Sequence, residues 1–171
     1  MPVWSRRHAH ALRDAWHPLQ TPKTENRKPL VTLEAIHSAI PHRAPMLLVD
    51  EILSQEEDSI VCQKTFRAEE YFFQGHYPDQ PIVPGVILCE ATVQSGAILL
   101  SSKMKEQSGV PVLTRMSDVK FRNMVKPGDS IEMSVKIDDI VSTAFYLTGV
   151  AKVNGKVAAR LSFTCTVAEA G

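Results

Sequence analysis

One helix-length run of the sequence, Val86 to Ser102 (VILCEATVQSGAILLSS), is apolar on every side and contains Glu90 as its only charged residue. A helix that is apolar all round has to be enclosed by other elements of the fold. A lone carboxylate in such a helix is costly unless it is paired or hydrogen-bonded. We therefore expect Glu90 to be buried and to have either a partner or a chemical function.

The second half of the sequence predicts a sheet that could enclose this helix. Apolar and polar residues alternate strictly over Ile131 to Ile137 and again over Leu161 to Val167, as in half-buried strands. Pro127-Gly128 and Asn154-Gly155 lie between such runs, and Asn-Gly is a strong signal for a two-residue hairpin turn. The pattern indicates an α+β fold in which an antiparallel meander curls around one buried helix.

The segment before the buried helix predicts three shorter elements. Thr32 can cap a helix over Leu33 to Ala39. Met46 to Val49 and Ile60 to Phe66 are apolar or β-branched runs separated by the polar stretch Ser54 to Ser59, so we expect them to pair as a hairpin.

Composition and charge divide the chain into an extension, residues 1–29, and one domain, residues 30–171. The extension contains four prolines and has six basic against two acidic residues, a net charge of +4. Its composition predicts a flexible tail, with a targeting or docking role as the alternative. The whole chain has 19 basic and 19 acidic residues, so charge gives no reason to expect nucleic acid as a partner.

Cysteine and hydropathy patterns favour a cytoplasmic protein. Cys62, Cys89 and Cys165 are odd in number and lie in apolar runs, which is typical of buried thiols rather than of a disulfide framework. We expect no apolar run to be long enough to span a bilayer, and therefore no membrane association. Cys89 could be a nucleophile beside Glu90, but an apolar site disfavours the thiolate, and a structural role is the stronger interpretation.

The usual motifs of hydrolases, nucleotide-binding proteins and zinc enzymes are absent, since the sequence has no G-x-S-x-G, P-loop, G-x-G-x-x-G, C-x-x-C or H-E-x-x-H. We therefore expect no cofactor and no metal.

His76 is the candidate base for chemistry without a cofactor. A single loop histidine is more often a surface residue than a catalyst, but its neighbours change this balance. Gly75 is expected to allow a close backbone approach, and three prolines stiffen the loop that follows. Pro84 and Gly85 then open the helix, whose first N–H groups, at Gly85 and Val86, could stabilise an oxyanion on a carbonyl substrate.

Glu90 lies five positions beyond Gly85, which is about 7.5 Å along a helix. That distance fits a substrate extended along the helix start. The alternative for Glu90 is a structural hydrogen bond, with Gln94 one turn further along as the partner.

Four segments resemble the 3-hydroxyacyl-acyl carrier protein dehydratase family. They are Pro41-His42-Arg43 with Leu47 to Asp50, QGHYPDQPIVPGVILCEATVQ (Gln74 to Gln94), VKFRNMVKPGD (Val119 to Asp129) and VNGKVAA (Val153 to Ala159). The resemblance spans about residues 30 to 168. It implies the hot-dog fold, and dehydration of (3R)-3-hydroxyacyl-acyl carrier protein to the trans-2-enoyl thioester in fatty acid biosynthesis.

The resemblance also implies roles for individual residues. His76 matches the catalytic histidine and Glu90, 14 positions later, the catalytic acid. Gly85 and Val86 match the helix start that binds the thioester, and Tyr77 and Gln94 are expected to contact the substrate.

In the family the two catalytic residues come from two chains, so the implied active unit is at least a homodimer, and assembly of three dimers is common there. Lys120, Arg122 and Lys126 are candidates for docking the acidic acyl carrier protein, with a solvated strand face as the alternative. Two other functions stay open: an acyl-thioester-binding hot-dog protein without activity, and a hot-dog thioesterase. Retention of both His76 and Glu90 favours the dehydratase.

Overall fold

The structure, a computed structural model, describes residues 33–104 and 110–168. The elements in chain order are α2 (Leu33–Ala39), β1 (Glu51–Gln55), β2 (Ser59–Thr65), the 3-10 helix η1 (Tyr71–Gln74), α3 (Gly85–Lys103), β3 (Val110–Phe121), β4 (Ser130–Val141), β5 (Ala144–Val153) and β6 (Lys156–Ala168). The proposed extension, residues 1–29, and the proposed cap Thr32 lie outside the described residues.

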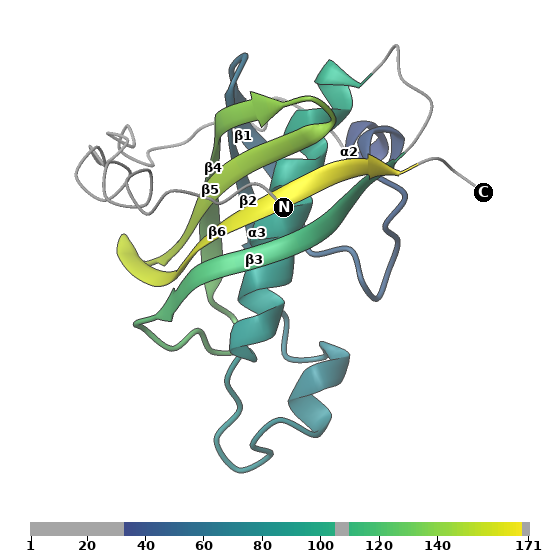
Figure 1. The fold of residues 1–171 in the computed structure, drawn as a ribbon. Coiled ribbons are helices and arrows are strands. Elements are labelled where there is room, and N and C mark those ends of the chain that lie inside the picture. Colours follow the sequence, from purple (N-terminus) through teal and green to yellow (C-terminus); the bar gives the residue numbers. More distant parts are fainter. Residues whose placement is uncertain (1–32, 105–109, 169–171) are drawn as a thin grey trace.

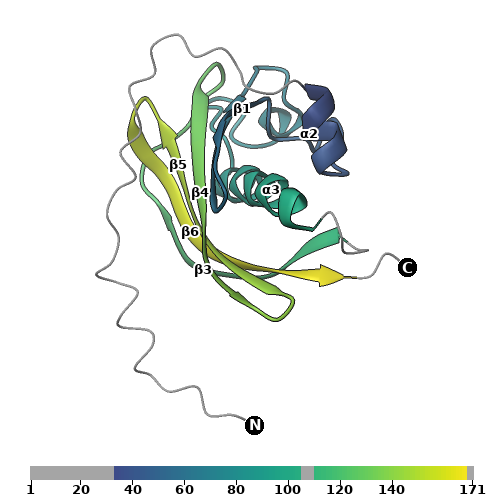
Figure 2. The same ribbon diagram turned by 90° about the horizontal axis from the view of Figure 1, so that it is seen from above.

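The six strands form one antiparallel sheet in the order β1-β2-β4-β5-β6-β3. The sheet is strongly curved, and α3 lies in its concave side with α2 beside it (Figures 1 and 2). Strands β4, β5 and β6 follow one another as the predicted meander. The α+β arrangement with a sheet around one helix is confirmed.

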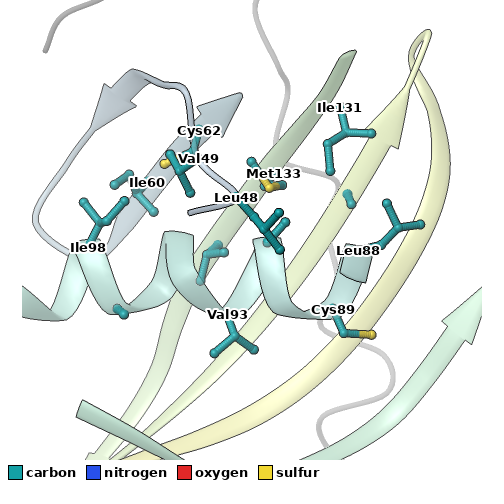
Figure 3. Packing of buried hydrophobic residues seen from close by; sticks show 14 of the residues in the cluster. Leu48, Val49, Ile60, Cys62, Leu88, Cys89, Val93, Ile98, Ile131 and Met133 are labelled. Carbon is teal, nitrogen blue, oxygen red and sulfur yellow. The ribbon is translucent and has the colours of Figure 1, made fainter. Parts of the chain in front are cut away.

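The core forms where α3 meets the inner face of the sheet. Helix residues such as Leu88, Cys89, Val93 and Ile98 pack with residues of β2, β4 and the segment before β1 (Figure 3). Every residue from Ala91 to Leu100 is buried, including the polar ones, because partners surround the helix on all sides.

The expectation that no apolar run is long enough to span a bilayer is wrong, because α3 is long enough. By length and composition α3 qualifies, with 19 residues. However, 67% of the qualifying window is buried inside the molecule, which identifies α3 as the core helix of this fold.

The first strand begins later than predicted. Met46 to Val49 is not a strand, and β1 instead covers Glu51–Gln55, where it pairs with β2. The physical reason is the side chain of Gln94, which bonds the Met46 carbonyl and the Leu48 N–H at 2.8 Å each. These backbone groups are occupied by a helix residue and are not available to a neighbouring strand. The helix at Leu33–Ala39 is confirmed.

The turns of the meander have the backbone that their sequences require. Asn154 and Gly155 both have positive φ, 49° and 75°, as the central residues of a type I′ hairpin turn do. Gly128 also has a positive φ of 89° in the connection before β4.

All three cysteines are free and buried, as predicted. Burial raises the pKa of Cys62 to about 12, an effect that a hydrogen bond with Ser95 partly offsets. Burial also raises the pKa of Cys165 to about 11, and that of Cys89 in the same direction. A structural role for Cys89 agrees with this, since the reactive form of a cysteine is the thiolate.

Candidate active site

His76 lies on a loop that is anchored at both ends. The loop begins after η1, where buried Phe72 accepts hydrogen bonds from the N–H groups of Gly75 and His76 at 3.3 and 2.9 Å. At the other end, the Val83 N–H donates to the Val125 carbonyl at 2.8 Å. In Figure 1 this segment extends beyond the first turn of α3. A loop held in this way fixes the position of the imidazole.

The imidazole of His76 is held in one tautomer. Its Nδ1 lies 3.0 Å from the Ile82 carbonyl oxygen. A carbonyl oxygen only accepts hydrogen bonds, so Nδ1 must be the protonated nitrogen. The neutral ring therefore carries its free lone pair on Nε2, which is the form of histidine that works as a general base.

The residues on either side of His76 differ in what they contribute. Tyr77 is 60% exposed and has a φ of 55°, a left-handed conformation that is unusual for an aromatic residue. Its ring contacts the His76 ring edge-on, with centroids 4.5 Å apart. The close approach expected at Gly75 is wrong, because a Cβ there would meet nothing within 4 Å.

The start of α3 is capped by backbone groups only. Pro84 is the N-cap and makes no side-chain capping bond, while its carbonyl accepts from Ile87 and Leu88. The N–H groups of Gly85 and Val86 precede the first intrahelical donors and have no acceptor within the helix. The Phe121 ring covers Gly85 so closely that a Cβ there would come within 2.8 Å of it.

Glu90 is less buried than its helix predicts. Its side chain is 30% exposed, although its neighbours Cys89 and Ala91 are buried. The predicted partner is present, since Gln94 Nε2 donates to Glu90 Oε1 at 2.8 Å. The same carboxylate oxygen lies 3.7 Å from His42 Nε2.

Gln94 holds Glu90 in a fixed orientation. Its side chain is fully buried, its Oε1 accepts from Leu48, and its two Nε2 hydrogens go to Met46 and Glu90. The Leu48 N–H fixes which end of the amide is the oxygen. Glu90 Oε1 is therefore an acceptor, and in the protonated acid the hydrogen belongs on Oε2.

The two candidate catalytic side chains belong to separate groups of contacts. His76 contacts Ile82 and Tyr77, whereas Glu90 contacts Gln94 and His42. Within the described part of the chain, no hydrogen bond or ion pair joins His76 to Glu90. The two side chains therefore have no contact partner in common among these interactions.

Comparison with known proteins identifies the family. Residues 40–163 match the model of the FabA-like domain. The chain belongs to the FabA-like family. Its relatives include the 3-hydroxyacyl-(acyl-carrier-protein) dehydratase FabZ of Caulobacter vibrioides, which is 41% identical over 144 residues, 82% of this chain and 91% of that protein. The enzyme of the same name from Streptococcus agalactiae is 37% identical over 138 residues, 81% of this chain and 99% of that protein.

Solved structures with much lower identity share the fold. The dehydratase heterocomplex ApeI:P of Xenorhabdus doucetiae matches with a TM-score of 0.68 at 16% identity, over 78% of this chain and 91% of that one. The PaaI protein of E. coli matches with a TM-score of 0.61 at 14% identity, over 78% and 92%. These matches confirm the hot-dog fold.

Of the basic residues in the segment Val119 to Asp129, Lys120 is in β3 and Arg122 and Lys126 follow the end of that strand. Lys120, Arg122 and Lys126 are all exposed. Lys120 is paired in register with Arg160, and the Arg122 N–H donates to the Ala158 carbonyl at 2.8 Å. Lys120 and Arg122 are the sequence neighbours of Phe121, whose ring covers Gly85 at the start of α3.

His42 is the site residue that sequence analysis did not single out. It stands in the Pro41-His42-Arg43 segment, 48 positions before Glu90, and no periodicity relates the two. As for metals, residues 33–104 and 110–168 contain no group of three or more His, Cys, Asp or Glu side chains that could hold an ion.

Proposed function

We propose that this chain dehydrates 3-hydroxyacyl-acyl carrier protein to the trans-2-enoyl thioester in fatty acid biosynthesis, as a hydro-lyase without a cofactor. The observation that carries the proposal is the Nδ1 hydrogen bond of His76 to the Ile82 carbonyl, which leaves Nε2 free as a base. The FabZ enzymes that are 36–41% identical to this chain support the substrate.

His76 is proposed to remove the proton on the carbon next to the thioester carbonyl. The electron pair of that C–H bond moves toward the carbonyl oxygen, which gains negative charge. The N–H groups of Gly85 and Val86 and the dipole of α3 stabilise this charge. Val86 is 72% exposed, so this residue of the helix start is accessible to a thioester, whereas the Phe121 ring covers Gly85.

Glu90 is proposed to protonate the departing hydroxyl group from Oε2. Gln94, being fully buried, contacts Glu90 rather than the substrate. Its role in this proposal is to keep Oε1 occupied as an acceptor, so that the acidic hydrogen is on the outer oxygen. The partial exposure of Glu90 allows its proton to be replaced from solvent after each turnover.

The complete site is proposed to form between two copies of the chain, with His76 from one and Glu90 from the other. Strand β3 supports this, because it is an edge of the sheet and bonds to β6 on one side. Its exposed apolar residues include Val112, Met116 and Val119. An unpaired edge with apolar side chains is suited to pairing with a second copy.

The acyl carrier protein is proposed to dock on Lys120, Arg122 and Lys126, with the exposed ring of Tyr77 contacting the thioester arm. These basic side chains complement an acidic carrier, and two of them flank Phe121 at the helix start. A cytoplasmic location is proposed because all three cysteines are free thiols.

The proposal is tested by following the absorbance of the conjugated enoyl thioester with 3-hydroxyacyl substrates on carrier protein. Replacing His76 by Ala or Glu90 by Gln should each lower kcat on the order of a hundredfold to ten-thousandfold, because each removes a general acid or base. His37→Ala and Glu69→Gln are matched controls, since His37 lies on α2 and Glu69 is exposed before η1.

A wild-type chain that binds the substrate without forming enoyl product would overturn the dehydratase. Release of free carrier thiol without enoyl formation would instead identify a thioesterase. Wild-type turnover in either active-site variant would remove that residue from the mechanism.

A further inference from the structure

We propose that His42 is a positioning residue for Glu90, toward whose Oε1 it directs its Nε2–H. The inference rests on the proposed dehydration and concerns only the step in which the hydroxyl group leaves. In this arrangement the N–H groups of Gln94 and His42 both face Glu90 Oε1, and the acidic proton is carried by Oε2.

The contact itself lies at the surface end of the site. His42 Nε2 is 3.7 Å from Glu90 Oε1, with the two side chains 33% and 30% exposed. Gln94 reaches the same oxygen from the buried side at 2.8 Å. The carboxyl group is therefore held between a buried amide and a half-exposed imidazole, both of which face the oxygen that does not donate.

The tautomer of His42 follows from its other nitrogen. Nδ1 is buried and has no hydrogen-bond partner among the described residues. A buried N–H without an acceptor is unfavourable, because the group loses its hydrogen bond to water. The proton of the neutral ring is thus better placed on Nε2, which faces Glu90 Oε1 at 3.7 Å, a polar contact longer than a hydrogen bond. This is the opposite tautomer to that of His76, whose Nδ1 carries the proton.

The backbone that carries His42 is tied down independently of Glu90. The Arg43 guanidinium donates to the carbonyls of Ile40, His42 and His37 at 2.9, 2.7 and 3.0 Å. Further along, Met46 and Leu48 are bonded to Gln94. Because Gln94 also binds Glu90, the segment with His42 and the carboxyl group share one anchor. This makes the placement of His42 a property of the fold rather than of a free side chain.

The step that His42 assists conserves atoms and charge. The C–O bond breaks with its electron pair on oxygen, which takes the proton from Glu90 Oε2 and leaves as water. Glu90 becomes a carboxylate, while His76 has gained the proton from carbon. Donors from His42 and Gln94 stabilise the carboxylate as it forms, and solvent then exchanges the two protons.

The experiment compares His42→Ala, His42→Asn and His42→Gln on two thioesters, one with a 3-hydroxyl and one with a 3-chloro group. Chloride leaves without a proton, so its elimination needs the base but no acid. Glutamine keeps an N–H donor near the position of Nε2, whereas the shorter asparagine does not reach. The Ala and Asn variants should lose about tenfold in kcat on the hydroxyl substrate at unchanged KM, and Gln should restore most of it.

With the chloro substrate, the His42 variants and Glu90→Gln should eliminate at the wild-type rate, while His76→Ala should not. His37→Ala is the control for the loss of a nearby imidazole, since only the backbone carbonyl of His37 is bonded to Arg43.

The inference on His42 is overturned if its Ala and Asn variants dehydrate the hydroxyl substrate at the wild-type rate. Equal losses on both substrates would also overturn it, because they would indicate a disturbed loop rather than a disturbed acid. If wild-type protein dehydrates nothing, the proposed function fails instead. If the His42→Ala variant does not fold, the inference is tested by comparing kcat of the His42→Asn and His42→Gln variants on the hydroxyl substrate.

Discussion

At the scale of single residues, Gln94 is the link between the structural core and the chemistry. Its amide is saturated by the backbone of Met46 and Leu48 and by the Glu90 carboxyl group. A polar side chain in the interior is stable only when its groups are paired, and here the pairing also orients an acid. The same residue thus determines where the chain before β1 runs and which oxygen of Glu90 is free.

Replacing Gln94 by Leu should lower both stability and turnover. The Leu48 N–H would lose its partner in a buried position, at a cost of about 1–3 kcal/mol for each unpaired group. Glu90 would lose its buried donor at the same time. Urea unfolding measures the first effect and the enoyl assay the second. Gln55→Leu, at an exposed position of β1, is the control, and equal stability of the two variants would contradict this account.

The sequence singled out candidate residues, but it predicted their surroundings and partners only in part. Glu90 was identified because a charged side chain in an apolar helix is unfavourable unless it is paired or has a function. Its hydrogen bond to Gln94 follows from the helical spacing of four residues. The degree of its burial was not evident, since it depends on the elements that pack against α3. His42 approaches Glu90 across 48 positions of sequence through the loop that Arg43 holds, which no local pattern encodes.

At the scale of elements, α3 and β5 approach each other at a glycine. A Cβ on Gly149 would overlap the Thr92 Cγ2 methyl group. The Thr92 hydroxyl is already committed to the Leu88 carbonyl at 2.8 Å, so this side chain cannot simply turn away. The packing of the central helix on the sheet thus depends on the absence of one methyl group on β5.

Gly149→Ala should therefore destabilise the fold by about 1–3 kcal/mol through overpacking. Thr92→Ser in the same chain should recover most of this loss, because serine keeps the hydroxyl and removes the methyl group. A double-mutant cycle by urea unfolding measures the coupling. Gly75→Ala is the matched control, since its Cβ would meet nothing within 4 Å. If the effects of Gly149→Ala and Thr92→Ser on the free energy of unfolding are additive, the proposed contact between these two residues is refuted.

Alternation identified the parts of β4 and β6 correctly because those strands are regular and covered on one face. It failed at Met46 to Val49, where Leu48 and Val49 are buried although the segment is not a strand. Strand β3 was not assigned bounds from its sequence. Its register shifts between Leu113 and Arg115 and between Ser117 and Lys120, and each shift interrupts the period of two that identifies a strand.

At the scale of the whole molecule, the proposed site combines residues of two copies of the chain. If each site takes His76 from one copy and Glu90 from another, two inactive variants should complement each other. Co-expressed chains with His76→Ala and with Glu90→Gln would form mixed dimers in which one site is intact and the other lacks both groups. Random pairing then gives about a quarter of wild-type activity.

Each variant prepared alone and mixed without exchange of subunits is the control and should stay inactive. No recovery after verified exchange would mean that both residues act from the same chain. This arrangement was available from the sequence only through the family resemblance, because periodicity and motifs describe one chain at a time.

Because Cys62, Cys89 and Cys165 are buried, the rate at which their thiols are alkylated reports how often the folded structure opens. Unfolded chains ionise their cysteines near pH 9.0, whereas in the folded state the pKa of Cys62 is about 12 and that of Cys165 about 11. Because the folded state keeps the thiols protonated, burial of the neutral thiols imposes no ionisation cost on the folded state below pH 9.0. The free energy of unfolding decreases as the pH rises from 9.0 toward those values. At neutral pH an alkylating reagent consumes only molecules that have transiently opened, so its rate counts such events without any added label.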